Sequence, residues 1–173
     1  MYTTFNNLPE DVLYTILLNA DIDEINNLCY IKPFNKLCSE QFWINLFQND
    51  HLPIIEHQHT IPDWVKEYKK IYSIIYKVNF LFEQIKVKKL TNLYIDSIYD
   101  KSIENLYLPK LIAPKNFYSS LIIKILNDDY IIGFNSYPSK TASYTKDEFK
   151  NFVINMLYYY PDLHVKGTID III

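Results

Sequence analysis

Arginine is absent from this chain of 173 residues, and all 17 basic residues are lysines. Arginine is the side chain best suited to paired hydrogen bonds with phosphates and base edges, so its absence argues against nucleic-acid recognition. The lysines are also scattered, with Lys69-Lys70 and Lys88-Lys89 as the adjacent pairs, and the formal net charge is -3. We therefore expect no nucleic acid among the partners.

Glycine is nearly as scarce, since Gly133 and Gly167 are the two in the chain. A glycine-rich phosphate-binding loop is thereby excluded, and no nucleophile-elbow pattern is present. The neighbouring carboxylates Asp128 and Asp129 lie between two apolar runs, where a turn is a better interpretation than a catalytic pair. We expect no catalytic residues, no cofactor and no enzymatic activity.

Histidines cluster once, at His51, His57 and His59 with Glu56 nearby, while His164 is remote in sequence. A zinc site needs three or four converging ligands with supporting hydrogen bonds, and this spacing does not ensure them. We expect solvated loop histidines and no metal site.

Long apolar runs are missing, and none approaches the roughly 20 residues that a membrane helix needs. The first seven residues lack the basic and apolar segments of a secretory signal. Cys29 and Cys38 lie within apolar helical patterns, so we expect buried, reduced thiols rather than a disulfide. These features together predict a cytoplasmic protein without membrane association.

Apolar and aromatic residues are abundant, at 49% and 16% of the chain, so there is ample material for a core. The pattern divides into three regions: residues 1–52, 53–90 and 91–173. We expect a helical module, a connection with a long amphipathic helix, and a small α+β domain. The predicted fold class is therefore α+β.

The first region predicts three or four short helices. Pro9 suits the first turn of one helix, Asp23 can cap a second, and Pro33 can open a third. The first helix carries apolar residues on one face, namely Leu8, Val12, Leu13, Ile16 and Leu17. A core this small is marginal alone and gains stability from a partner or from the following region.

Residues Leu8 to Leu17 read Leu-Pro-Glu-Asp-Val-Leu-Tyr-Thr-Ile-Leu, which resembles the opening of the F-box family. That opening is Leu-Pro, two acidic positions and a run of aliphatics. The spaced apolar residues up to Leu37, followed by Ser39-Glu40-Gln41-Phe42-Trp43, resemble the rest of the family pattern and its terminal tryptophan. The chain departs from the pattern at Ala20-Asp21 and in the stretch Lys32–Lys36, which is one residue short.

This resemblance implies a helical scaffold that docks onto a Skp-type adaptor protein. The chain would then be a substrate-receptor subunit linking an unknown target protein to a Skp-cullin-RING ubiquitin ligase. The family pattern implies six contacts with the adaptor: Leu8, Pro9, Ile16, Leu17, Leu28 and Phe34. The composition also resembles that of F-box proteins from large DNA viruses with AT-rich genomes, which would act in the host cytoplasm or nucleus.

An alternative is a structural or protein-interaction domain with no ligase link, in which the N-terminal helices simply pack on the rest of the chain. The two interpretations differ in whether a Skp-type adaptor binds.

A long helix is predicted from Pro62 to about Lys89. Its apolar residues follow a four-three spacing, at Trp64, Tyr68, Ile71, Ile75, Val78, Phe82 and Ile85. A coiled-coil dimer is one interpretation. The irregular, aromatic-rich seam favours the other, in which the stripe packs against the flanking regions. In F-box proteins a helix at this place ties the module rigidly to the recruiting domain.

The last region predicts an antiparallel sheet with a covering helix. Leu121–Leu126 and Tyr130–Phe134 are expected to form a hairpin, with further strands at Leu93–Ile98 and Thr168–Ile173. Thr145-Lys146-Asp147-Glu148 is a capping box that opens a helix ending near Tyr159. The polar segment Asn135–Tyr144 is expected to be a loop.

Overall fold

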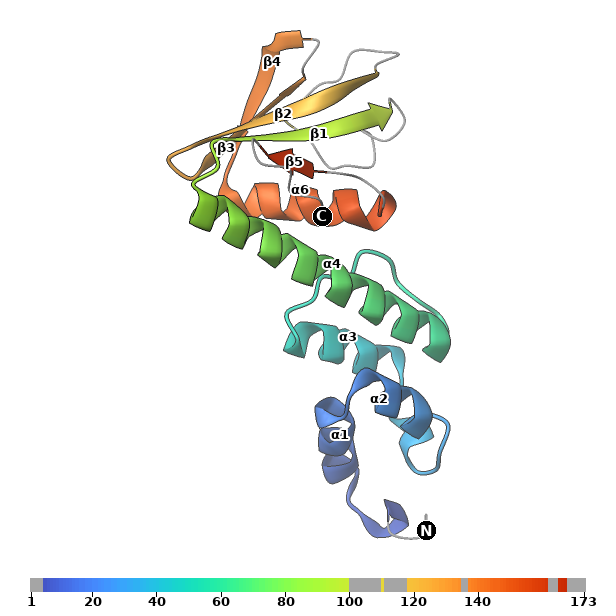
Figure 1. Cartoon of the computed structure of the whole chain (residues 1–173). Helices are drawn as coiled ribbons and strands as arrows, with labels where there is room; N and C mark the ends of the chain where they lie inside the picture. Colours follow the sequence, from blue (N-terminus) through green and yellow to red (C-terminus); the bar gives the residue numbers. More distant parts are fainter. Residues whose placement is uncertain (1–4, 100–109, 111–117, 135–136, 162–164, 168–173) are drawn as a thin grey trace. The chain divides into compact units, whose positions relative to one another are not determined.

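The computed structural model of the chain describes residues 5–99, 110, 118–134, 137–161 and 165–167 (Figure 1). The described residues form helices followed by an antiparallel sheet and a further helix, so the α+β class is confirmed. None of the helices described is long and apolar enough to cross a membrane.

The chain divides into two compact units, and the boundary along the sequence falls between Ser73 and Ile74. This division falls inside helix α4 (Ile61–Lys88), which therefore contributes residues to both units. The sequence had instead suggested this helix as a separate connection, residues 53–90, between two domains.

The N-terminal unit is helical. It contains η1 (Phe5–Asn7), α1 (Glu10–Asn19), α2 (Ile22–Leu28), η2 (Phe34–Lys36), α3 (Glu40–Asn49) and the first part of α4. The short helices of the expected module are thus confirmed. Asp21, rather than the predicted Asp23, caps α2. Its side chain accepts a hydrogen bond from the Glu24 main-chain N–H, and the Glu24 side chain accepts one from the Asp21 main-chain N–H.

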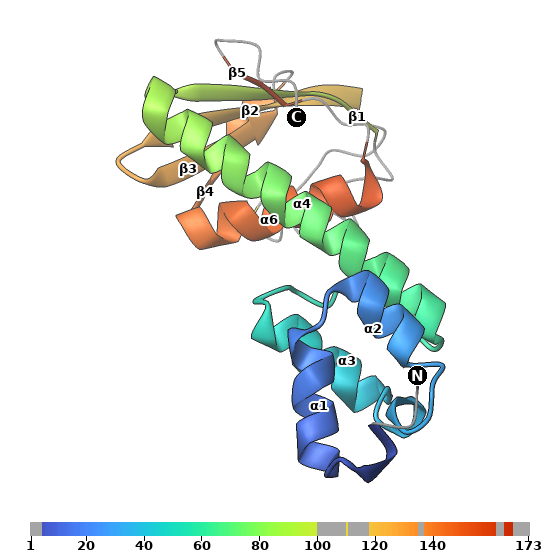
Figure 2. The same ribbon diagram turned by 60° about the horizontal axis from the view of Figure 1, so that its bottom comes forward.

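Helix α3 is the centre of this unit, and α1 and α4 pack against it (Figure 2). On the α1 side, the Asn45 side-chain amide donates to the Tyr14 hydroxyl at 2.7 Å. On the α4 side, Phe47 meets the edge of Trp64 at 5.7 Å between ring centroids. The core consists mainly of large apolar side chains, including Leu13, Leu17, Ile25, Phe34, Phe42, Trp43, Leu46, Phe47, Trp64 and Ile71.

Cys29 and Cys38 form a disulfide, with their Cα atoms 5.6 Å apart. The prediction of two reduced thiols is therefore wrong. The turn that carries η2 brings the end of α2 back beside the start of α3, and this return is not encoded in the local apolar pattern. The disulfide also removes the argument that linked reduced cysteines to a cytoplasmic location.

Helix α4 begins and ends within one residue of the predicted limits. Residues of the apolar seam have partners within the chain: Trp64 and Tyr68 contact Phe47 in the N-terminal unit, and Phe82 contacts Tyr130 in the C-terminal unit. This supports packing against the flanking regions over a two-stranded coiled coil.

The C-terminal unit contains a five-stranded antiparallel sheet in the order β4-β3-β2-β1-β5. Its strands are β1 (Asn92–Tyr99), β2 (Tyr118–Leu126), β3 (Asp129–Phe134), β4 (Tyr137–Tyr144) and β5 (Val165–Gly167). The hairpin and the strand at Leu93–Ile98 are confirmed. The predicted strand Thr168–Ile173 lies outside the described residues.

Strand β4 occupies most of the segment predicted as the loop Asn135–Tyr144, so that prediction is wrong. The segment has no apolar run, but it pairs with β3, with Ala142 opposite Ile132. It lies at the sheet edge, where a strand tolerates Pro138 because one side needs no ladder hydrogen bond.

Asn127 and Asp128 form the two-residue turn between β2 and β3, with φ of 49° and 68°. Two positive φ values are typical of the type I′ turn, whose twist matches that of the flanking strands. The prediction of a turn at this place is therefore confirmed for Asp128, whereas Asp129, the second residue of the acidic pair, begins β3.

Helix α6 (Lys146–Tyr159) runs along one face of the sheet (Figure 1). Its Phe149 stacks on Tyr130 of β3 at 4.4 Å between ring centroids, and Phe82 of α4 contacts both rings. The predicted capping box is present, with Thr145 and Glu148 each accepting from the other's main chain.

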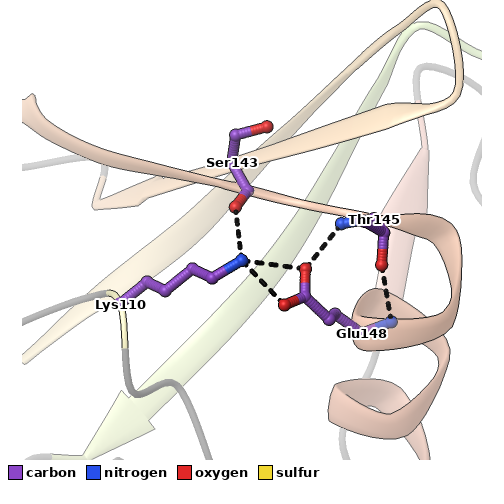
Figure 3. Close-up of polar contacts among 4 residues, drawn as sticks. All are labelled: Lys110, Ser143, Thr145 and Glu148. Atoms are coloured by element: carbon purple, nitrogen blue, oxygen red, sulfur yellow. Dashed lines mark hydrogen bonds and ion pairs between the residues drawn. The ribbon is translucent and has the colours of Figure 1, made fainter.

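Lys110 extends this capping box into a network (Figure 3). Its ammonium lies 2.7 and 2.9 Å from the two Glu148 carboxylate oxygens and 3.3 Å from the Ser143 carbonyl oxygen. The hydrogen bonds from Lys110, with that from the Thr145 main chain, hold the pKa of the Glu148 carboxyl below its ordinary value.

Candidate functional site

The six residues predicted to contact an adaptor fall into two groups in the structure. Leu8 and Pro9 are exposed, and Ile16 and Leu28 are half-buried. Val12, which was not in the predicted set, is 39% exposed and adds an apolar side chain one turn before Ile16. The start of α1 thus offers an apolar edge, which we call the Leu-Pro edge and define as Leu8, Pro9, Val12 and Ile16.

Leu17 and Phe34 lie inside the N-terminal unit, each with no exposed surface. The rings of Phe34 and Phe5 pack edge to face, with 5.2 Å between their centroids. Both side chains therefore support the module from within, and in this arrangement they present no surface to a partner.

A cleft of about 560 Å³ opens at the other end of α1. Helices α1 to α4 all contribute to it, and its lining includes Ala20, one of the departures from the F-box pattern. Sequence reasoning did not single out this cleft, because its polar residues are far apart in the chain and none forms a motif.

Asp50 and Tyr68 are hydrogen-bonded inside this cleft, where the Tyr68 hydroxyl donates to Asp50 Oδ2 at 2.5 Å. Burial raises the pKa of Tyr68, and the bond to the carboxylate raises it further. Tyr68 therefore remains a protonated donor throughout the physiological range. The apolar seam predicted Tyr68 as a packing residue, and no signal in the sequence pointed to the hydrogen bond of its hydroxyl.

His51, His57 and His59 are all exposed. Nδ1 of His57 lies 3.4 Å from Glu40 Oε1, a surface pairing across the start of α3. Within the part of the chain that the structure describes, no three His, Cys, Asp or Glu side chains converge in a way that would hold a metal ion.

Comparison with known proteins adds no relative: no protein-family model, no curated protein and no solved structure matches the chain.

Proposed function

We propose that the N-terminal unit is an F-box-like docking module that attaches the chain to a Skp-type adaptor of a cullin-RING ubiquitin ligase. The observation that carries this proposal is the exposure of the Leu-Pro edge, where Leu8 and Val12 are 37% and 39% exposed beside buried Leu13 and Leu17. Part of the apolar stretch that resembles the family opening is thus available to a partner, while Leu13 and Leu17 support the helix from within.

The physical basis is the packing of a short helix face into an apolar groove, in which a few anchors supply most of the binding energy. Leu8 and Pro9 precede α1, while Val12 and Ile16 follow one another along it at a spacing of four residues. Leu28 on α2 is half-buried and offers a smaller additional contact.

The C-terminal unit is, in this proposal, the part that recruits a target protein. Its sheet and covering helix have a packed core of their own, including Ile95, Leu121, Ile132 and Phe149. Acting through the ligase places the protein in the cytoplasm or nucleus of the cell, and a viral origin would make this the host cell.

Co-purification with a Skp-type adaptor tests the proposal. The full chain should form a stable complex, and Leu8→Ala with Pro9→Ala should reduce adaptor recovery at least tenfold while the protein stays soluble. Tyr30→Ala is a matched control, since Tyr30 is an exposed aromatic of the same unit outside the Leu-Pro edge. Equal recovery of the double variant and the unchanged chain would refute the proposal.

A second candidate is a protein-interaction domain with no ligase link. The burial of Leu17 and Phe34 favours it, because two of the six predicted adaptor contacts are unavailable in this structure. This candidate predicts a well-behaved protein without adaptor and no recovery of adaptor under any condition, whereas the docking module gains stability from the complex.

A further inference from the structure

The cleft at the end of α1 has the chemistry of a site for an organic cation. Asp21 and Asp50 line it, together with Tyr68 and Tyr72, whose rings stack on each other. Its volume of about 560 Å³ is within the range of roughly 300–1,000 Å³ found for ligand pockets.

Asp50 is partly engaged and retains accepting capacity. Its Oδ2 accepts from the Tyr68 hydroxyl and its Oδ1 from the Asn49 side-chain amide at 3.2 Å. An ionised carboxylate has about four lone-pair positions, so one on each oxygen remains after these bonds. The bonds also fix the orientation of the carboxylate, which reduces the cost of ordering it around a ligand.

Tyr72 provides an aromatic face beside these carboxylates. Its ring stacks on Tyr68 with 6.1 Å between centroids and 16° between planes, yet it is 60% exposed. Lysine and arginine groups are attracted to such a face by the ring quadrupole.

The charge around the cleft is negative. Asp21 and Asp50 are the acidic residues of its lining, and Asp23 and Glu24 follow Asp21 in the sequence. Lys69 is the one cation in the lining, and its ammonium pairs with Asp23 Oδ1 at 2.5 Å. The Asp21 and Asp50 carboxylates make no ion pair with a described residue, so they can attract an incoming positive group.

We propose that this cleft binds a lysine or arginine side chain of a partner protein. The space exceeds that of one side chain, and Asn19 and Asn49 line the cleft as well. Each donates its amide N–H within the chain, Asn19 to the Thr15 carbonyl oxygen and Asn49 to Asp50, so that both amide oxygens can accept main-chain N–H groups of an extended peptide.

This site lies in the same unit as the Leu-Pro edge but is separate from it. The Leu-Pro edge lies at the beginning of α1, whereas Leu18 and Asn19 at its end line the cleft. Loss of cation binding would therefore leave adaptor binding unchanged, and the reverse also holds.

Titration of the ¹⁵N-labelled full chain, followed by NMR, tests the proposal. The probes are acetyl-Gly-Arg-Gly-amide and acetyl-Gly-Lys-Gly-amide, with the citrulline tripeptide as the neutral isostere of the arginine one. We expect the Asn19 and Asn49 side-chain amides to shift with the charged peptides, and at least tenfold weaker binding of the citrulline peptide. Equal binding of arginine and citrulline peptides, or no shift with either cation, would overturn the proposal.

Variants localise the binding. Asp50→Asn should weaken the arginine peptide about tenfold, since it removes the charge from the fixed acceptor. Tyr72→Leu should weaken it about three-fold, and because this ring is largely exposed the fold should persist. Glu83→Gln, an exposed acidic position of α4 outside the cleft, is the control and should bind normally. Binding of free n-butylammonium as tight as that of the lysine peptide would overturn the assignment to a protein side chain.

Discussion

Trp43 of α3 and Trp64 of α4 stack with their ring planes 2° apart and their centroids separated by 6.2 Å. They are the two tryptophans of the chain, and both are almost completely buried in the N-terminal unit. Tryptophan fluorescence therefore reports on this unit, which allows its stability to be followed separately from that of the sheet.

Trp64→Ala should destabilise the N-terminal unit by about 3–5 kcal/mol, the range for removing a large buried aromatic from a core. The ring packs against Trp43 and Phe47, so its loss leaves a cavity at the junction of α3 and α4. Urea unfolding followed by the fluorescence of Trp43 measures the effect. Tyr30→Ala, at a largely exposed ring, should change the free energy of unfolding by less than about 0.5 kcal/mol. Similar losses in both variants would contradict the packing described.

Reduction of the Cys29–Cys38 disulfide should destabilise the same unit. The crosslink closes a short loop between residues nine apart in sequence, for which chain entropy predicts a loss of about 2–3 kcal/mol. Urea unfolding with and without dithiothreitol measures it. The double variant Cys29→Ala with Cys38→Ala should be insensitive to dithiothreitol, and a wild-type midpoint equally insensitive would show that the bond does not stabilise the fold.

The pairing of Lys110 with Glu148 should make the C-terminal unit sensitive to acid. The folded-state pKa of Glu148 lies below its ordinary value of 4.5, so its stabilising effect is present above that value and is lost as the pH falls through the lowered pKa. Circular dichroism during urea unfolding at pH 7 and pH 3 should show a smaller acid-induced loss for Glu148→Gln than for the unchanged chain.

Asp147→Asn is the matched control for this acid sensitivity, because Asp147 lies in the same first turn of α6 outside the Lys110 network. It should retain the larger part of the acid-induced loss. If Glu148→Gln and Asp147→Asn behave alike, the general attraction of acids to a helix start, and not the Lys110 contact, explains the effect.

Asp128→Gly should stabilise the β2–β3 hairpin by about 0.5 kcal/mol. Asp128 has φ of 68°, a region that costs glycine little, and Asn-Gly is the preferred pair for this turn. The same change at Asp129, which pairs with Leu126 in the ladder, should instead destabilise the hairpin. Thermal unfolding followed by circular dichroism distinguishes these opposite signs.

The sequence alone determined those elements whose apolar spacing, helix cap or turn residues lie within a single segment. The long helix, the helix opened by Thr145 and Glu148, and the hairpin at Asn127-Asp128 were predicted within a few residues. In each case the signal lies within one segment, either as a repeating apolar spacing or as a turn that needs particular side chains. The apolar opening of α1 was likewise visible, and with it the resemblance that supports the proposed docking function.

Only the tertiary structure decided features that depend on distant segments. Strand β4 has no apolar run and acquires its conformation by pairing with β3, while Cys29 meets Cys38 because an intervening turn returns the chain. Burial likewise divided one apolar stripe, leaving Val12 outside and Leu17 inside. The cleft brings together Asp21, Asp50 and Tyr72 from three of the four helices that line it. Its chemistry exists only where those helices converge, because no local pattern relates residues that far apart in the chain.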